Sequence, residues 1–177
     1  RLGDLNSPAT YDVLANAGFE MGATGADGVP GWQLQPAATG SATIETTAAQ
    51  DGTQALLLSC EGPAVQLVSD EFDPPQTGRL SVWVWLRVDP DAPQRWLRLA
   101  VEGKLNGETY YRYAQVGAGR EGLHVGTEWT PYQFLIDDLP FDGLSRLRVR
   151  FDLNAPGAVH VDSVKLSHLA FSQTELK

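Results

Sequence analysis

The sequence predicts an all-β fold, a β-sandwich of two antiparallel sheets. Short runs of alternating apolar and polar residues recur about every 8–12 residues, and Gly, Pro, Asn and Asp separate them. No stretch shows the 3.6-residue period of a long helix. The 177 residues fit one domain, and a hydrophobic content of 42% is enough to build its core.

Nine runs are the expected strands. They are Ser41–Thr47, Gln54–Glu61, Ala64–Ser69, Arg79–Asp89, Trp96–Lys104, Glu108–Val116, Thr130–Ile136, Leu144–Leu153 and Ala158–Phe171. No internal repeat or low-complexity linker interrupts residues 13–171, which we therefore take as one domain. Residues 1–12 are expected to be an N-terminal linker or extension. Residues 172–177 are expected to start a C-terminal helix or linker, because Ser172 and Glu175 have the spacing of a capping box.

The run Arg79–Asp89 separates into two faces, because successive strand side chains point to opposite sides of a sheet. The aliphatic face, which we expect in the core, holds Leu80, Val82, Val84, Leu86 and Val88. The outer face holds Ser81, Trp83, Trp85 and Arg87.

Asn106-Gly107 predicts a two-residue hairpin turn, because both central residues of a type I′ turn need positive φ. Such a turn pairs Leu105 with Glu108 and thereby sets every later pair. The inner face then holds Leu97, Leu99 and Val101, and the outer face holds Trp96, Arg98, Glu102, Tyr111, Tyr113 and Gln115. Arg112 falls on the inner face, so we expect it near the sheet end with its guanidinium in solvent.

The run Leu147–Leu153 follows the same rule, with Arg148, Arg150 and Asp152 pointing outward. The predicted outer surface is therefore rich in Trp, Tyr, Arg and Gln. Solubility alone would be served by Thr, Lys and Glu, so this composition indicates a surface that contacts something.

The net charge of −9 argues against nucleic-acid binding, which needs a basic footprint. Residues 1–78 hold ten acidic residues and only Arg1, and this acidity either serves solubility or helps to hold a cation. The single cysteine, Cys60, excludes an internal disulfide and is expected to be buried in its apolar run. The sequence shows no membrane-spanning stretch and no leader, which leaves localisation open.

The sequence favours a protein without catalytic activity. It has no G-x-S-x-G elbow, no H-E-x-x-H motif and no phosphate-binding glycine loop. Glu71-Phe72-Asp73 matches the start of a pattern found in sandwich glycosidases, but Pro74 and Pro75 follow. Prolines belong to loops and sheet edges rather than to a central catalytic strand.

Five motifs follow one another along the chain. They are Asn16-Ala17-Gly18-Phe19-Glu20 with Gly31-Trp32, then Asp51–Leu58, Leu80–Asp89, Glu128–Phe134 and Gly157–Leu166. Their order and spacing resemble the calcium-stabilised jelly-roll carbohydrate-binding modules of families four, nine, sixteen and twenty-two, a galactose-binding-like group. The resemblance covers residues 13–171. It implies a jelly-roll sandwich and an exported or cell-surface location, as part of a larger bacterial protein.

The resemblance also implies a structural Ca²⁺. Glu20 and Asp162 would be its carboxylate ligands, with backbone carbonyls near Gly18 and Gln54. This set suits an ion that takes about six to eight oxygen ligands. The alternative is that each carboxylate is capped or solvated.

Carbohydrate is the partner that the resemblance implies, held by flat aromatic rings against sugar C–H faces and by planar polar groups against hydroxyls. The expected binding residues are Trp83, Trp85, Arg87, Trp96, Arg98, Tyr111, Tyr113 and Gln115. The alternative is a protein or interdomain contact in a larger protein, because exposed aromatic patches mark interfaces of several kinds.

Overall fold

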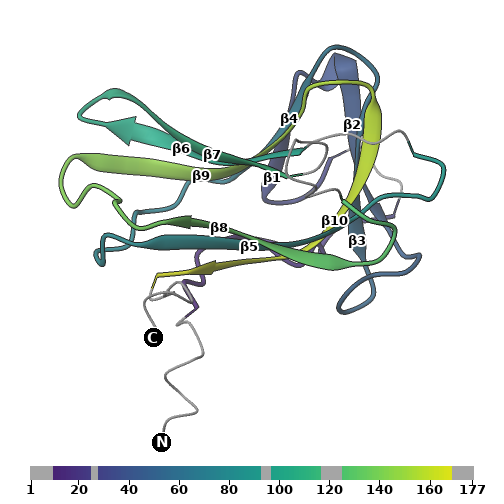
Figure 1. Cartoon of the computed structure of the whole chain (residues 1–177), viewed down its shortest axis with the longest axis horizontal. Helices are drawn as coiled ribbons and strands as arrows, with labels where there is room; N and C mark the ends of the chain where they lie inside the picture. The colour runs from purple at the N-terminus through teal and green to yellow at the C-terminus, as the bar shows by residue number, and fades with distance from the viewer. Residues whose placement is uncertain (1–9, 25–27, 93–96, 117–124, 169–177) are drawn as a thin grey trace, which may run out of the picture.

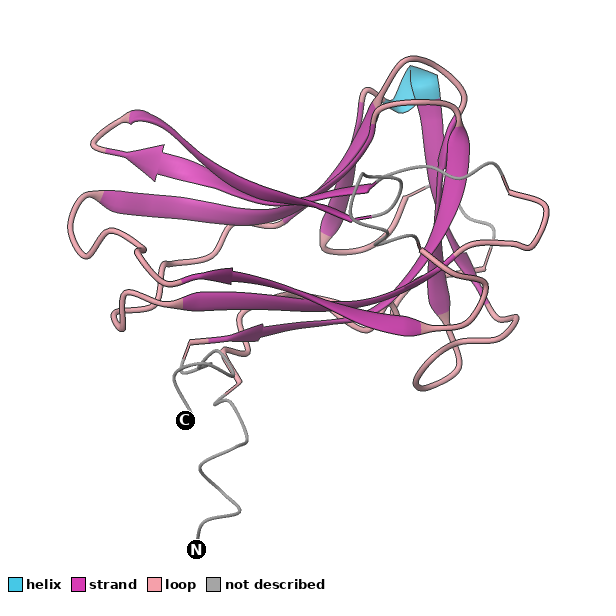
Figure 2. Cartoon of the chain, in the orientation of Figure 1, coloured by secondary structure: helices cyan, strands magenta, loops and turns pink. Residues whose placement is uncertain are grey.

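A computed structural model describes residues 10–24, 28–92, 97–116 and 125–168. Within these ranges ten strands form two antiparallel five-stranded sheets that pack face to face (Figure 1). Strands dominate, and the helix among the described residues is a short 3₁₀ turn at Ala37–Thr39 (Figure 2). The predicted fold class is confirmed.

We name the two sheets after a central strand of each. The β5 sheet has the order β2 (Gly40–Glu45), β3 (Ala55–Cys60), β10 (Gly157–Ser167), β5 (Leu80–Arg87) and β8 (Thr130–Ile136). The β6 sheet has the order β1 (Trp32–Gln35), β4 (Val65–Ser69), β9 (Leu144–Leu153), β6 (Leu97–Leu105) and β7 (Glu108–Val116). Each sheet therefore has one face toward the other sheet and one outer face.

The core lies between the sheets and follows the predicted alternation. Val84 and Leu86 of β5 and Leu99 and Val101 of β6 are fully buried. Cys60 is also buried, and its Sγ lies 3.2 Å from the carbonyl oxygen of Gly62.

The hairpin between β6 and β7 has the predicted register, from Leu105 opposite Glu108 to Leu97 opposite Val116. Asn106 and Gly107 both have positive φ, as a type I′ turn requires. Arg112 reaches Asp138, at the end of β8, over 2.7 Å and keeps 40% of its side chain exposed. Its guanidinium reaches solvent as predicted, but Arg112 lies in the middle of the edge strand β7, opposite Val101, and not at the sheet end.

Strand β1 was not predicted. It has four residues, and only two of them, Trp32 and Leu34, point toward the core, so the alternation is too short to recognise. The helix expected in residues 172–177 lies outside the described residues. Contacts with the sandwich begin within the expected N-terminal extension, because the Tyr11 amide donates to Leu166 O over 2.8 Å and Thr10 pairs with Ser167.

Strand β10 carries a bulge between Asp162 and Lys165, where Ser163 has a φ of 52°. The bulge lets the Val164 amide donate to Ala17 O over 2.9 Å, so the N-terminal segment is tied to the outside of the β5 sheet. Among the described residues, we find no helix of the length and apolarity needed to cross a membrane.

Candidate functional site

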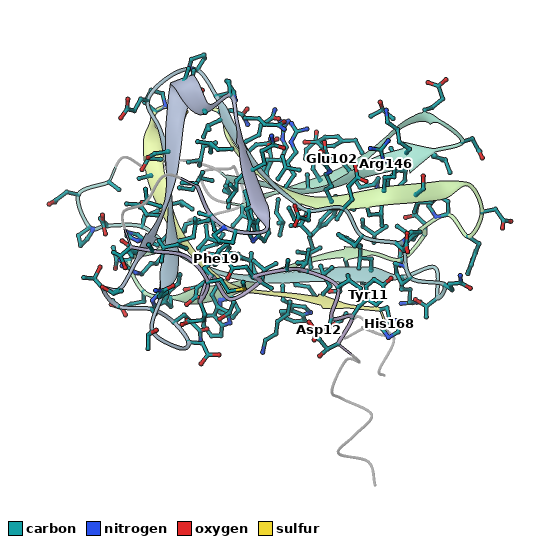
Figure 3. The ribbon with its side chains drawn as sticks, turned by 180° about the vertical axis from the view of Figure 1, so that it is seen from behind. Tyr11, Asp12, Phe19, Glu102, Arg146 and His168 are labelled. Atoms are coloured by element: carbon teal, nitrogen blue, oxygen red, sulfur yellow. The ribbon has the colours of Figure 1, made fainter. Side chains whose placement is uncertain are left out.

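The outer face of the β6 sheet carries most of the predicted binding residues. Pairing in the sheet places Arg98, Tyr111, Tyr113 and Gln115 on this face. Glu102 of β6 and Arg150 and Asp152 of β9 lie beside them. Figure 3 shows Glu102 and Arg146 at this side of the molecule, with Tyr11 and His168 at the opposite side.

Two tyrosines and two arginines stack on this face. The Tyr111 and Tyr113 rings have centroids 5.5 Å apart and are tilted by 34°. The Arg98 guanidinium lies 4.5 Å from the Tyr113 ring centroid, and the Arg150 guanidinium lies 5.1 Å from that of Tyr111. These distances are typical of cation–π contacts. Tyr113 remains half exposed, so one ring in this stack is accessible from solvent.

Acidic side chains hold the second arginine in place. Arg150 donates to both carboxylate oxygens of Asp152, over 2.7 and 3.0 Å, and to Glu102 over 3.0 Å. Asp152 is only 1% exposed, and its two-point pairing with Arg150 offsets the cost of burying its charge. Burial raises the pKa of the Tyr111 hydroxyl, against the opposing effect of its hydrogen bond with Arg98.

A hollow of about 300 Å³ continues this face toward the hairpin end. It is lined by Glu71, Glu102, Gly103, Lys104, Thr109, Arg146 and Arg148. Glu71 accepts hydrogen bonds from Arg146, the shortest 2.8 Å, and from Arg148 over 3.0 Å. These hydrogen bonds lower the pKa of Glu71, and the bond with Arg146 has the largest effect. Among the described residues Lys104 has no ion-pair partner.

The prediction that Trp83, Trp85 and Arg87 extend this surface is wrong. They lie on the outer face of the β5 sheet, where Trp83 and Trp85 pair with Gln133 and Pro131 of β8, and Arg87 pairs with His160 of β10. The two outer faces point away from each other, so one ligand cannot contact both sets. Alternation identifies the outward residues of a strand, but it does not reveal to which sheet the strand belongs.

The outer face of the β5 sheet is partly covered. The Arg87 guanidinium lies 5.2 Å from the Trp129 ring centroid, and the Trp129 indole donates to Ala48 O over 2.7 Å. His160 is 5% exposed and lies between two carboxylates, with Nδ1 against Glu45 and Nε2 2.9 Å from Asp89. These contacts connect β2, β5 and β10 and partly bury Trp83, Trp85 and Arg87, while Pro131, Gln133 and Lys165 on the same face stay exposed.

Trp96 lies outside the described residues, so its predicted place on the β6 face is an expectation only. Sequence reasoning missed the glutamines that extend this face across the far strands, Gln33 and Gln35 on β1 and Gln66 on β4. Gln35 pairs with Gln66, and its side-chain amide donates to Gln33 over 3.1 Å. Gln33 and Gln35 were missed because β1 was not predicted, whereas Gln66 lies in the predicted run Ala64–Ser69, whose outer face was not assigned.

The predicted calcium ligand Asp162 is fully buried under residues 50 and 51. One carboxylate oxygen accepts from the amides of Gln50 and Asp51, over 2.8 and 3.2 Å, and the other accepts from Ser163 over 2.7 Å. Burial raises the pKa of Asp162 and the nearby charge of Glu20 raises it further, against the lowering effect of the three amides. The two predicted carboxylates are thus close enough to interact.

Glu20 accepts hydrogen bonds from Thr53 and Gln54, which lower its pKa, with the Gln54 amide as the largest cause. The Gln54 side-chain amide, oriented to satisfy its own hydrogen bonds, donates to Phe19 O over 3.0 Å and to Glu20 O over 3.2 Å. Two carboxylates and nearby carbonyls suit Ca²⁺ by ligand type. The carboxylate oxygens already accept hydrogen bonds from amides, so their charge is partly compensated without an ion. Each oxygen has further lone pairs, which could still bind a cation.

Comparisons with known proteins support the fold. No protein-family model and no curated protein matches the chain. Among solved structures, the chain is similar to the CBM22-1 xylan-binding domain of Paenibacillus barcinonensis Xyn10C, with a TM-score of 0.62 and 17% identity over 94% of this chain and 99% of that one.

A second similar structure is TmCBM61 in complex with β-1,4-galactotriose, with a TM-score of 0.57 and 18% identity over 90% of this chain and 99% of that one. A third is the enzymatically active domain of bacteriophage CBA120 tailspike protein 4, with a TM-score of 0.64 and 13% identity over 87% of this chain. This chain spans 21% of that tailspike chain. The jelly-roll resemblance drawn from the sequence is confirmed, and at these identities it concerns the fold.

Proposed function

We propose that this chain is a non-catalytic carbohydrate-binding module that weakly holds a polysaccharide or oligosaccharide on the outer face of the β6 sheet. The observation that carries the proposal is the half-exposed ring of Tyr113, held by Tyr111 and Arg98 on an open sheet face. Two of the similar solved structures are described as a xylan-binding domain and as a complex with a galactotriose.

The chemistry of this face suits sugars. A fixed aromatic ring offers a flat apolar surface to pyranose C–H groups, while Arg98 and Gln115 offer planar donors and acceptors to hydroxyls. Only one of the two rings is half exposed, so the aromatic contact area is small and the affinity should be low. Trp83, Trp85 and Arg87 leave the proposed site, and Trp96, which lies outside the described residues, stays in it only as an expectation from the sequence.

A structural Ca²⁺ between Glu20 and Asp162 is part of the proposal. The buried charge of Asp162 and the repulsion from Glu20 both favour a cation there. The ion would join the segment before β1 to β10. An extracellular location within a larger protein is also part of the proposal, since polysaccharides of this kind lie outside cells.

A glycan array followed by affinity electrophoresis tests the function. The wild type should bind at least one polysaccharide, and Tyr113→Ala should abolish the retention while leaving the melting temperature within a few degrees. Phe141→Ala is the matched control, because Phe141 is a 77% exposed aromatic between β8 and β9 whose ring lies against Gly78, before β5. A folded protein that binds no glycan would overturn the proposal and favour a protein or interdomain contact.

A further inference from the structure

The outer face of the β6 sheet has a charge opposite to that of the whole chain. Its described part, including the hollow, holds the cations Arg98, Lys104, Arg146, Arg148 and Arg150 and the anions Glu71, Glu102 and Asp152. Five cations against three anions give +2, whereas the chain as a whole carries −9. Such a local field attracts anions to one face of an acidic protein.

The cations of the hollow are available to a ligand. Glu71 accepts from Nε and one Nη of Arg146 and from one Nη of Arg148, which leaves N–H groups on both guanidiniums. The Arg146 side chain is 64% exposed, and the exposed Lys104 ammonium has no ion-pair partner among the described residues. Guanidinium groups match the planar geometry of carboxylate and sulfate oxygens.

Charge and aromatic surface lie along one strand. Thr109 lines the hollow, and Tyr111 and Tyr113 follow on the same face of β7. At about 3.3 Å per residue, the distance from Thr109 to Tyr113 is about 13 Å. A polymer lying on this strip would place sugar rings against the tyrosines and acidic substituents against Lys104, Arg146 and Arg148.

We infer that the polysaccharide bound here is acidic, a chain of sugars bearing carboxylate or sulfate groups; this inference rests on the proposed function. The aromatic strip favours a glycan over an acidic peptide, because sugar rings can lie flat on Tyr111 and Tyr113. The overall charge of −9 also opposes the long polyphosphate backbone of a nucleic acid.

Matched pairs of polymers test the inference by affinity electrophoresis and calorimetry. The pairs are polygalacturonate with its methyl ester, and chondroitin sulfate with its desulfated form. In at least one pair the acidic member should bind about tenfold more tightly, and this preference should shrink as salt rises, because ions screen exposed charges. If the uncharged member binds as well in every pair, the inference is wrong, and the proposed function stands as long as Tyr113→Ala abolishes that binding.

Three variants locate the effect. Lys104→Gln should weaken binding of the acidic polymer about two- to fivefold, the range of one exposed ion pair. Lys165→Gln, the same change on the outer face of the β5 sheet, should not. Glu71→Gln should strengthen the binding, because it removes a competing anion. Equal losses in both lysine variants, or equally tight binding of duplex DNA that survives Tyr113→Ala, would show unspecific attraction and overturn the inference. If the protein binds none of these polymers, the proposed function is overturned as well.

Discussion

The two outer faces of the sandwich have similar amino-acid composition but differ in how far other segments cover them. Each has two aromatic residues beside arginine: Trp83 and Trp85 with Arg87 on the β5 sheet, and Tyr111 and Tyr113 with Arg98 and Arg150 on the β6 sheet. On the β5 sheet, Trp129 lies over Arg87, and the fully buried Asp162 pairs with Trp85. On the β6 sheet no described loop buries the stack, and half of Tyr113 is exposed.

The difference teaches that an outward aromatic residue is not necessarily an exposed one. Segments remote in sequence determine whether an outward residue is covered. The segment 10–20 and residues 50 and 51 lie against β10 from outside. The outer face of the β5 sheet thus behaves partly as a second, minor core, whereas the β6 face remains a surface. Stability and binding should therefore depend on different faces.

The largest expected effect separates these roles directly. Trp85→Ala should lower the free energy of unfolding by about 2–4 kcal/mol, because it removes a large and mostly buried ring. Tyr113→Ala should lower it by less than about 1 kcal/mol, because half of that ring is already in solvent. Urea denaturation of both variants measures the contrast. Equal losses would mean that both faces are structural, and the comparison would fail.

Removal of calcium should have the next largest effect on stability, because the proposed ion lies at Asp162 in the β5 sheet. At a calcium concentration of 100 times Kd, the ion would contribute about 2.7 kcal/mol, so chelator should lower the melting temperature of the wild type. Asp162→Asn should not respond to chelator. Asp137→Asn, which changes an exposed carboxylate after β8, should respond like the wild type. Uniform responses would place the ion elsewhere, and no response in the wild type would exclude it.

The pH dependence in chelator isolates the buried carboxylate. Because the folded state raises the pKa of Asp162, it holds that proton more tightly than the unfolded chain does. Wild-type stability should therefore fall relative to Asp162→Asn as pH rises from the unfolded value of about 3.9 through the raised folded pKa. The lowered pKa of Glu20 acts in the opposite direction in both proteins, so the difference reports Asp162 together with its interaction with Glu20. A difference in stability between the wild type and Asp162→Asn that does not change with pH would contradict a raised pKa for Asp162.

A smaller expected effect on stability concerns the β6 sheet. Asp152→Asn keeps the size of a buried side chain but weakens its two-point pairing with Arg150, so we expect a loss of about 1–2 kcal/mol in urea. Glycan binding should weaken too, because Arg150 contacts the Tyr111 ring. Arg112→Gln, which breaks an exposed pair with Asp138, is the control and should change neither. A loss of binding without any loss of stability would make Asp152 a direct ligand contact.

The sequence was informative where structure is local. Alternation in residues 80–88 and 147–153 and the Asn106-Gly107 turn predicted the inner faces and the hairpin register, because both depend on neighbours in the chain. The order of the strands in each sheet depends on remote pairing. That is why Trp83 and Tyr113 were assigned to one surface although they lie on opposite faces of the molecule.

The hollow beside Glu71 shows the same limit. Its lining comes from the segment after β4, from both strands of the hairpin and from β9. No single run of sequence contains the pattern, and Glu71 itself was considered only as part of a catalytic motif. Charge counts along the chain also average over both faces, so they hide a surface of opposite sign.

The stack of Arg98, Tyr113, Tyr111 and Arg150 has a consequence for the entropy of binding. A free tyrosine or arginine side chain loses about 0.5–1.5 kcal/mol of conformational freedom when a ligand immobilises it. Here each ring already lies against a guanidinium, and Arg150 is held by two carboxylates. Most of that ordering takes place when the protein folds, so a ligand meets a preorganised surface. Replacing Arg98 would then weaken binding largely by returning motion to Tyr113.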